Sequence, residues 1–112
     1  MAIHSMHIRA VVQNGIADIK VLIQHPMDTG LLKDAKTGQF IPAHFIRQLV
    51  ASIQGKTVLE AEWGPGISRN PYLNFRVANT HPGDTVEIRW TDNLGDSDTA
   101  HTVIESAEQS PD

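Results

Sequence analysis

Short stretches in which polar and apolar residues alternate recur about every ten residues along this chain of 112 residues, and turn residues separate them. Alternation with a period of two places one set of side chains on the buried face of a sheet and the other set in water. No stretch shows the spacing of an amphipathic helix. The pattern therefore predicts an all-β protein, a sandwich of about seven antiparallel strands. Residues 1–112 contain no linker or repeat and are expected to form a single domain.

The clearest pair of strands is joined by Asn14-Gly15, the two-residue turn that most strongly favours a hairpin. Both positions of this turn readily adopt a positive φ. If these residues form the turn, Ile8 faces Val21, and the apolar side chains of both strands fall on one face. The same register predicts the facing pairs Gln13–Ile16, Ala10–Ile19, Met6–Ile23 and Arg9–Lys20.

The remaining strands are predicted over residues 45–53, 57–63, 72–78 and 85–91, followed by a last strand that ends near residue 105. Residues 45–53 are apolar enough for a more fully buried strand. Trp90 alternates with Val86 and Ile88, so we expect it in the core. The acidic residues 92–98 do not match the spacing of a calcium-binding EF-hand loop, and we expect a solvated hairpin turn there.

Composition excludes several classes of function. Nine basic and thirteen acidic residues give a net charge of −4, and no basic cluster is present that could neutralise nucleic-acid phosphates. The chain has no cysteine, which excludes disulfides, thiolate nucleophiles and iron–sulfur clusters. No apolar run approaches the roughly 18 residues of a membrane span. The first residues also lack the basic and apolar regions of a secretory signal.

Catalytic motifs are absent from the sequence. Ser68 lies in GPGISRNP, which lacks the Gly-x-Ser-x-Gly spacing of a nucleophile elbow. Gly64-Pro65-Gly66 leads into another turn instead of a helix, so it cannot form a phosphate cradle. We therefore predict that the chain is not an enzyme and binds no cofactor.

A long connection follows the first hairpin, from Pro26 to the apolar run that begins at Phe45. Connections of this length are usually functional, disordered, or a small structure of their own. Disorder is disfavoured by the apolar residues in the segment. Residues 34–38 offer a turn that could fold the segment back on itself. The apolar residues are Met27, Leu31, Leu32, Phe40 and Ile41.

One metal site is an alternative that the hairpin register leaves open. The register sets His4 opposite His25, with Met6 on the same face and Met27 just beyond. Two imidazoles and two thioethers are ligands that suit copper, so the chain could be a periplasmic copper-binding module. The competing interpretation is that the two histidines are hydrated residues at the open end of the hairpin. His44, His81 and His101 are scattered and are expected on the surface or in hydrogen bonds.

The sequence HPMDTG, followed by KDAKTGQFIPAHFI, resembles the SoxZ family, whose members are subunits of the SoxYZ sulfur-carrier complex of thiosulfate-oxidising bacteria. The resemblance continues through GKTVLEAEWGP, NPYLNFRV and GDTVEIRWTDNLGD, in the same order. It covers nearly the whole chain except the first dozen and the last eight residues.

The resemblance implies an immunoglobulin-like topology and a heterodimer with a SoxY-type subunit, whose C-terminal cysteine carries the sulfur intermediates. This chain would contribute no covalent chemistry, would meet other Sox enzymes only indirectly, and would reach the periplasm together with its exported partner. Candidate residues for the interface are apolar and lie in or beside the two Pro-containing segments. They are Ile41, Pro42, Phe45, Trp63 and Tyr72. Self-association of the isolated chain through this surface is a further expectation.

Overall fold

The computed structural model describes residues 5–107, which form eight β-strands and no helix. The described part of the chain therefore has no helix that could cross a membrane. In chain order the strands are β1 (Met6–Gln13), β2 (Ile16–Ile23), β3 (Ile46–Ile53), β4 (Lys56–Glu62), β5 (Tyr72–Ala78), β6 (Thr85–Asp92), β7 (Ser97–Val103) and β8 (Glu105–Ser106).

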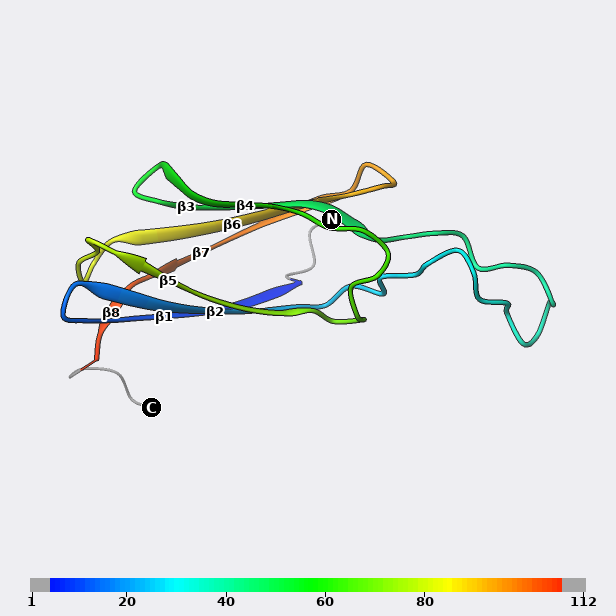
Figure 1. The fold of residues 1–112 in the computed structure, drawn as a ribbon, viewed down its shortest axis with the longest axis horizontal. Coiled ribbons are helices and arrows are strands. Elements are labelled where there is room, and N and C mark those ends of the chain that lie inside the picture. Colours follow the sequence, from blue (N-terminus) through cyan, green and yellow to red (C-terminus); the bar gives the residue numbers. More distant parts are fainter. Residues whose placement is uncertain (1–4, 108–112) are drawn as a thin grey trace.

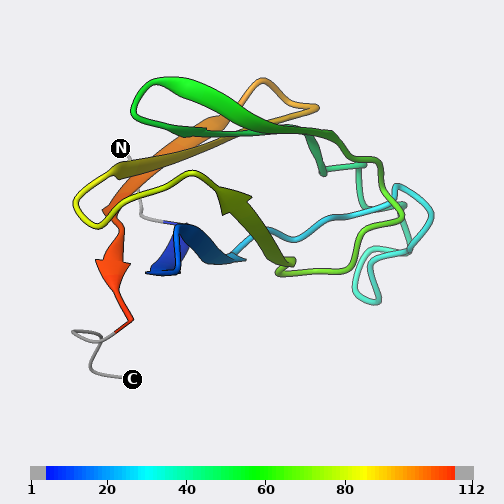
Figure 2. The same cartoon turned by 60° about the vertical axis from the view of Figure 1, so that its left-hand side comes forward.

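The strands form two four-stranded sheets that pack face to face (Figures 1 and 2). One sheet has the order β5-β2-β1-β8 and the other has the order β4-β3-β6-β7. The predicted all-β sandwich is thus confirmed. The structure adds one strand to the predicted seven, because the chain leaves β7 at Val103 and the short β8 then pairs in parallel with β1.

The first hairpin has the predicted register, including the facing pair Ile8 and Val21. Asn14 and Gly15 both have positive φ, 55° and 77° respectively, as the turn type requires. The apolar face of the hairpin is buried, with Ile19 and Val21 fully inaccessible. Alternation and turn chemistry together were therefore sufficient to set this part of the structure.

The core lies between the two sheets and receives alternate side chains from each strand. In β6 the residues Val86, Ile88 and Trp90 are buried as predicted, with Trp90 only 7% exposed. The strand predicted at residues 45–53 begins instead at Ile46 and is not buried on both faces. Arg47 and Gln48 are both exposed, because an irregularity in the pairing with β6 interrupts the alternation there.

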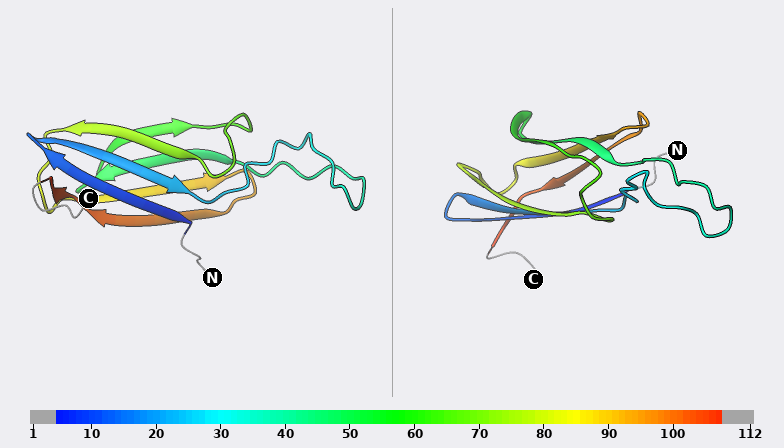
Figure 3. Two further views of the ribbon diagram at one scale, coloured as in Figure 1. Left: turned by 90° about the horizontal axis from the view of Figure 1, so that it is seen from below. Right: turned by 45° about the vertical axis from the view of Figure 1, so that its right-hand side comes forward.

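The long connection forms an ordered projection, which we call the extension (residues 24–45). It leaves the end of β2, reaches well beyond the sandwich and returns to β3 (Figure 3). Two isolated bridges hold its two legs together, between Asp28 and His44 and between Lys33 and Phe40. The turn predicted at residues 34–38 lies at its tip, where the N–H of Gly38 donates to the carbonyl of Asp34. The prediction that this segment folds back on itself is confirmed.

Candidate functional site

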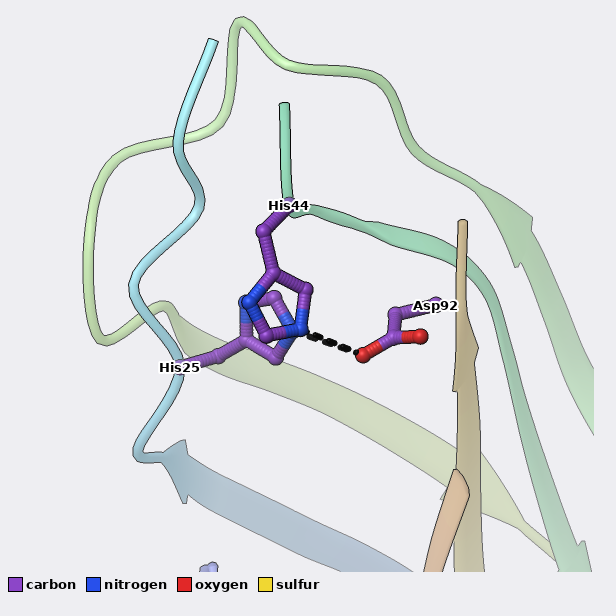
Figure 4. Close-up of side chains that lie close together, drawn as sticks. All are labelled: His25, His44 and Asp92. Atoms are coloured by element: carbon purple, nitrogen blue, oxygen red, sulfur yellow. Dashed lines mark hydrogen bonds and ion pairs between the residues drawn. The ribbon is translucent and has the colours of Figure 1, made fainter. Parts of the chain in front are cut away.

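Three polar side chains converge where the extension joins the sandwich (Figure 4). His25 follows the end of β2, His44 precedes the start of β3, and Asp92 is the last residue of β6. Because β3 and β6 are antiparallel, Ile46 pairs with Asp92, which places His44 beside the same carboxylate. We call His25, His44 and Asp92 the His–Asp–His cluster.

Asp92 lies at the centre of the cluster, and its side chain is fully buried. Its Oδ2 atom is 2.8 Å from Nε2 of His44 and 3.3 Å from Nε2 of His25. Its Oδ1 atom accepts the backbone N–H groups of Leu94 and Asp96. Both carboxylate oxygens therefore have two partners, as a buried charge requires.

The hydrogen bonds keep Asp92 ionised. Burial alone would raise the pKa of this carboxyl, but the bonds from His44, His25 and the two backbone N–H groups outweigh burial. The pKa of Asp92 consequently lies below its ordinary value. A carboxylate carries no proton of its own, so the facing Nε2 atoms of both histidines donate.

His25 is held as the neutral Nε2–H tautomer. The backbone N–H of Met27 donates to its Nδ1 atom at 3.1 Å, so that nitrogen carries a lone pair. Burial lowers the pKa of His25, and the nearby imidazole of His44 lowers it further, against the opposing effect of Asp92. The rings of His25 and His44 meet edge to face, with centroids 4.6 Å apart.

The cluster borders an open cavity of about 440 Å³. The indole ring of Trp90 contacts His25 edge to face, at a centroid distance of 5.2 Å. Its Nε1–H donates to Oγ of Ser5, and that hydroxyl donates to Asp98. These bonds tie the residue before β1 to β6 and β7, so the polar groups of Ser5, Trp90 and Asp98 on this wall of the cavity have defined partners.

The donor set of the cluster, two imidazoles and a carboxylate, is one that first-row divalent metals accept, and the three ligand atoms lie within 4.8 Å of one another. A metal-bound histidine, however, normally donates its other ring N–H to an acceptor. In His25 that other nitrogen faces a donor, the N–H of Met27. The tautomer that these hydrogen bonds imply therefore suits a hydrogen-bonded clamp better than a metal centre.

The copper site predicted from the sequence involves four residues, of which His4 lies outside the described residues. Met6 and Met27 are buried in the core, with 6% and 4% of their surface exposed. The Met27 sulfur accepts the N–H of Ile46. His25 already has partners on both ring nitrogens. The copper hypothesis stays a prediction.

Of the five interface candidates, Ile41 and Pro42 lie in the returning leg of the extension, Phe45 just before β3, Trp63 just after β4, and Tyr72 at the start of β5. Tyr72 is 57% exposed, Pro42 is exposed, and Ile41, Phe45 and Trp63 are half-buried. Phe45 and Trp63 line one depression of about 470 Å³ on the outer face of β3 and β4. Tyr72 pairs across the strands with Leu22, which is 51% exposed and adds to the apolar surface beside it.

The sequence pattern does not indicate that His44 and Asp92 lie together. The solvated turn predicted at residues 92–98 is wrong for Asp92, whose side chain is inaccessible. The arrangement of the strands contains the information that brings these two residues together. If the predicted strands 45–53 and 85–91 are paired antiparallel, the start of the first lies beside the end of the second, and His44 lies near Asp92.

Comparisons with known proteins show what this chain resembles. Two solved structures of superoxide reductase (neelaredoxin) from Ignicoccus hospitalis superpose with a TM-score of 0.58 at 18% identity, covering 92% of this chain and 80% of theirs. At this identity the likeness concerns the fold alone. A search of curated proteins finds no match. The family model "Sulphur oxidation protein SoxZ" matches residues 6–103, so the chain belongs to the SoxZ family.

Proposed function

We propose that this chain is the non-catalytic subunit of a SoxYZ-type sulfur-carrier complex, and that it binds and supports a SoxY-type subunit. The family match over residues 6–103 carries the proposal, since it already implies a role in sulfur oxidation. The sequence adds that the chain has no cysteine, so it cannot itself hold a sulfur intermediate through a thiolate. The covalent chemistry then belongs to the partner.

The surface that best fits partner binding lies at the end bearing the extension. Ile41, Pro42, Phe45, Trp63 and Tyr72 are our candidates for it. Trp63 and Phe45 line a depression, which is where aromatic residues give the most binding energy in protein interfaces. The surrounding Arg47, Gln48 and Glu62 would form a polar rim. A standard interface of about 1,600 Å² would extend over this whole end.

The same proposal places the complex in the periplasm, where the exported partner would carry this chain with it. Members of the SoxZ family are typically periplasmic. Contacts with the other sulfur-oxidising enzymes would then be indirect, through the carrier subunit.

Co-expression with a SoxY-type subunit, followed by purification through a tag on the partner only, tests the proposal. We expect both chains to co-purify in equal amounts, and thiosulfate-dependent turnover of the reconstituted pathway to require this chain. This chain alone should turn over nothing. If the chains separate and omission leaves turnover unchanged, the proposal is wrong, and copper binding by the isolated chain becomes the hypothesis to measure.

A further inference from the structure

The extension is a two-legged ribbon whose legs bond to each other from Asp28 outward, while backbone groups at its base, such as those of His25 and Phe45, bond to the sandwich and its loops. The N–H groups of Asp28 and His44 each donate to the other residue's carbonyl, at 2.7 and 2.9 Å. Further along, Ile41 donates to Leu32. Side chains add local bonds, such as that from the N–H of Leu31 to Thr29 Oγ1. The ribbon therefore has a definite shape that it can present to another molecule.

This ribbon has almost no core of its own. Among residues 26–45 only Met27 is buried, and it lies at the base. A two-stranded ribbon without a packed face is marginally stable at best in water. Ordering these residues also costs conformational entropy that the ribbon's own contacts hardly offset. A further surface that packs against the ribbon would supply the missing burial.

Large apolar side chains are exposed on the outer half of the extension. Leu31 is 79% exposed, Phe40 60% and Leu32 58%. Of the described large hydrophobic residues, Leu31 is the most exposed. Lys33 lies over the ring of Phe40 at 5.3 Å from its centroid, which still leaves the ring largely accessible. Exposed leucines and an aromatic ring gathered on one projection are typical of a contact site.

The His–Asp–His cluster fixes both legs of this projection at its base. His25 lies in the outgoing leg and His44 in the returning leg, and both bond to the same oxygen of Asp92. Close to the base the legs also touch, because a Cβ added at Gly30 would lie 3.2 Å from Cβ of Ala43. Asp92, which lies in the opposite sheet from β2, thus joins both legs at the base. Asn93 adds bonds to the returning leg, at Ala43 and Phe45, and Asn70 adds bonds to His25 in the outgoing leg.

We propose that the outer half of the extension, with Leu31, Leu32 and Phe40, is a docking site for the carrier subunit, and that Asp92 is the positioning residue that aims it. This inference rests on the proposed function. A standard interface takes roughly 20–30 residues from each partner, more than the outer half supplies, so the site would continue onto the end of the sandwich where Phe45 and Trp63 line the surface proposed for the same subunit. A second copy of this chain is a poorer occupant, because each copy carries a net charge of −4.

The test measures binding of the purified carrier subunit to variants of this chain by calorimetry. The double variant Leu31→Ser, Phe40→Ser removes the exposed side chains without touching the core. The matched control is Ile16→Ser, Val103→Ser, at two positions that are 47% and 53% exposed and lie at the far end of the sandwich. We expect the first pair to weaken the Kd about tenfold or more, and the control to change it less than about threefold.

A second experiment tests whether Asp92 orients the extension. The side chain of Asp92 is inaccessible to a partner, yet Asp92→Asn should weaken the Kd and speed hydrogen exchange at the amides of Asp28 and His44. Asp92→Asn lowers stability in either case, so the Kd of the folded protein decides: an unchanged Kd would show a merely structural effect and overturn the positioning role of Asp92.

The outcomes separate this inference from the proposed function. If the unaltered chain does not bind the carrier subunit, the proposed function is wrong. If it binds, and the Leu31→Ser, Phe40→Ser variant binds equally well, the function stands and the docking site is wrong. Self-association that disappears in the same variant, with binding to the carrier subunit unchanged, would assign the site to a second copy and also overturn the inference.

Discussion

The backbone N–H of Met27 donates to Nδ1 of His25, and the conformation of Met27 is what makes this bond possible. Met27 has a φ of 49°, a left-handed conformation that costs a non-glycine residue about 1 kcal/mol or more. Its side chain is buried, and its sulfur accepts the N–H of Ile46. The strained residue thus links the ring of His25 to the first residue of β3, and it makes a neutral His25 part of the folded structure.

Acidification should therefore destabilise the protein through His25. Its pKa in the folded state lies below the ordinary 6.5, so the unfolded chain binds this proton more readily. The contribution to stability is complete above about pH 6.5. It falls as the pH drops below that value and levels off once the folded state is also protonated. Urea unfolding at pH values from 8 to about 5 measures the slope of the free energy of unfolding against pH.

The variant His25→Gln is the control for this slope, because glutamine does not titrate. We expect it to be less stable than the unaltered chain at pH 8 and to lose less stability between pH 7 and about pH 5. An equal loss in both proteins would show that other groups cause the acid sensitivity. At lower pH, Asp92 adds to the effect in the same direction, since its depressed pKa gives stability that is lost as the pH falls below about 4.

Asp92→Asn should lower the free energy of unfolding by about 2–4 kcal/mol at pH 7. The amide cannot accept at its nitrogen, so one or more of the four donors around this buried side chain loses its partner. Asp96→Asn is the matched control in the same turn, at an exposed residue, and should change stability by less than about 0.5 kcal/mol. Comparable losses in both variants would contradict the central position of Asp92.

The packing of the hydrophobic core can be tested with two leucines, one buried and one exposed. Leu49 is fully buried in β3, so Leu49→Ala should cost about 2–5 kcal/mol through lost burial and the cavity that remains. Leu94 is 59% exposed, and Leu94→Ala should stay within about 0.5 kcal/mol of the unaltered chain. Urea unfolding of both variants under one set of conditions measures the difference. A cost at Leu49 below about 1 kcal/mol would mean that the two sheets do not pack as described.

The fold could be predicted from the sequence wherever local chemistry decides the structure. Asn14 and Gly15 set the hairpin, and the alternation around Ile88 identified a buried face correctly. The short β8 was missed because its two residues carry no pattern of their own. Its pairing with Val11 and Val12 depends on where the chain arrives after β7.

The candidate site was harder to predict, because tertiary geometry creates it. His25, His44 and Asp92 are far apart in the sequence, in three separate blocks of the SoxZ resemblance, and nothing in those blocks predicts that the three side chains meet. Only the antiparallel pairing of β3 with β6, combined with the return of the extension to β3, brings their side chains together. The extension itself was anticipated as a small structure because its apolar residues argued against disorder. Their exposure was not anticipated.

The last prediction concerns the two glycines of the extension. Gly30 and Gly38 both have positive φ, 85° and 71°, so alanine at either position adds backbone strain of about 1 kcal/mol. At Gly38 the new Cβ meets nothing within 4 Å, whereas at Gly30 it lies 3.2 Å from Cβ of Ala43 in the opposite leg. Only Gly30→Ala should therefore push the legs apart. Hydrogen exchange at the amides of Asp28 and His44, which bond the legs together, should speed up markedly in Gly30→Ala and little in Gly38→Ala. Equal exchange in the two variants would mean that the legs do not pack at Gly30, and the extension would then lack the fixed direction that docking requires.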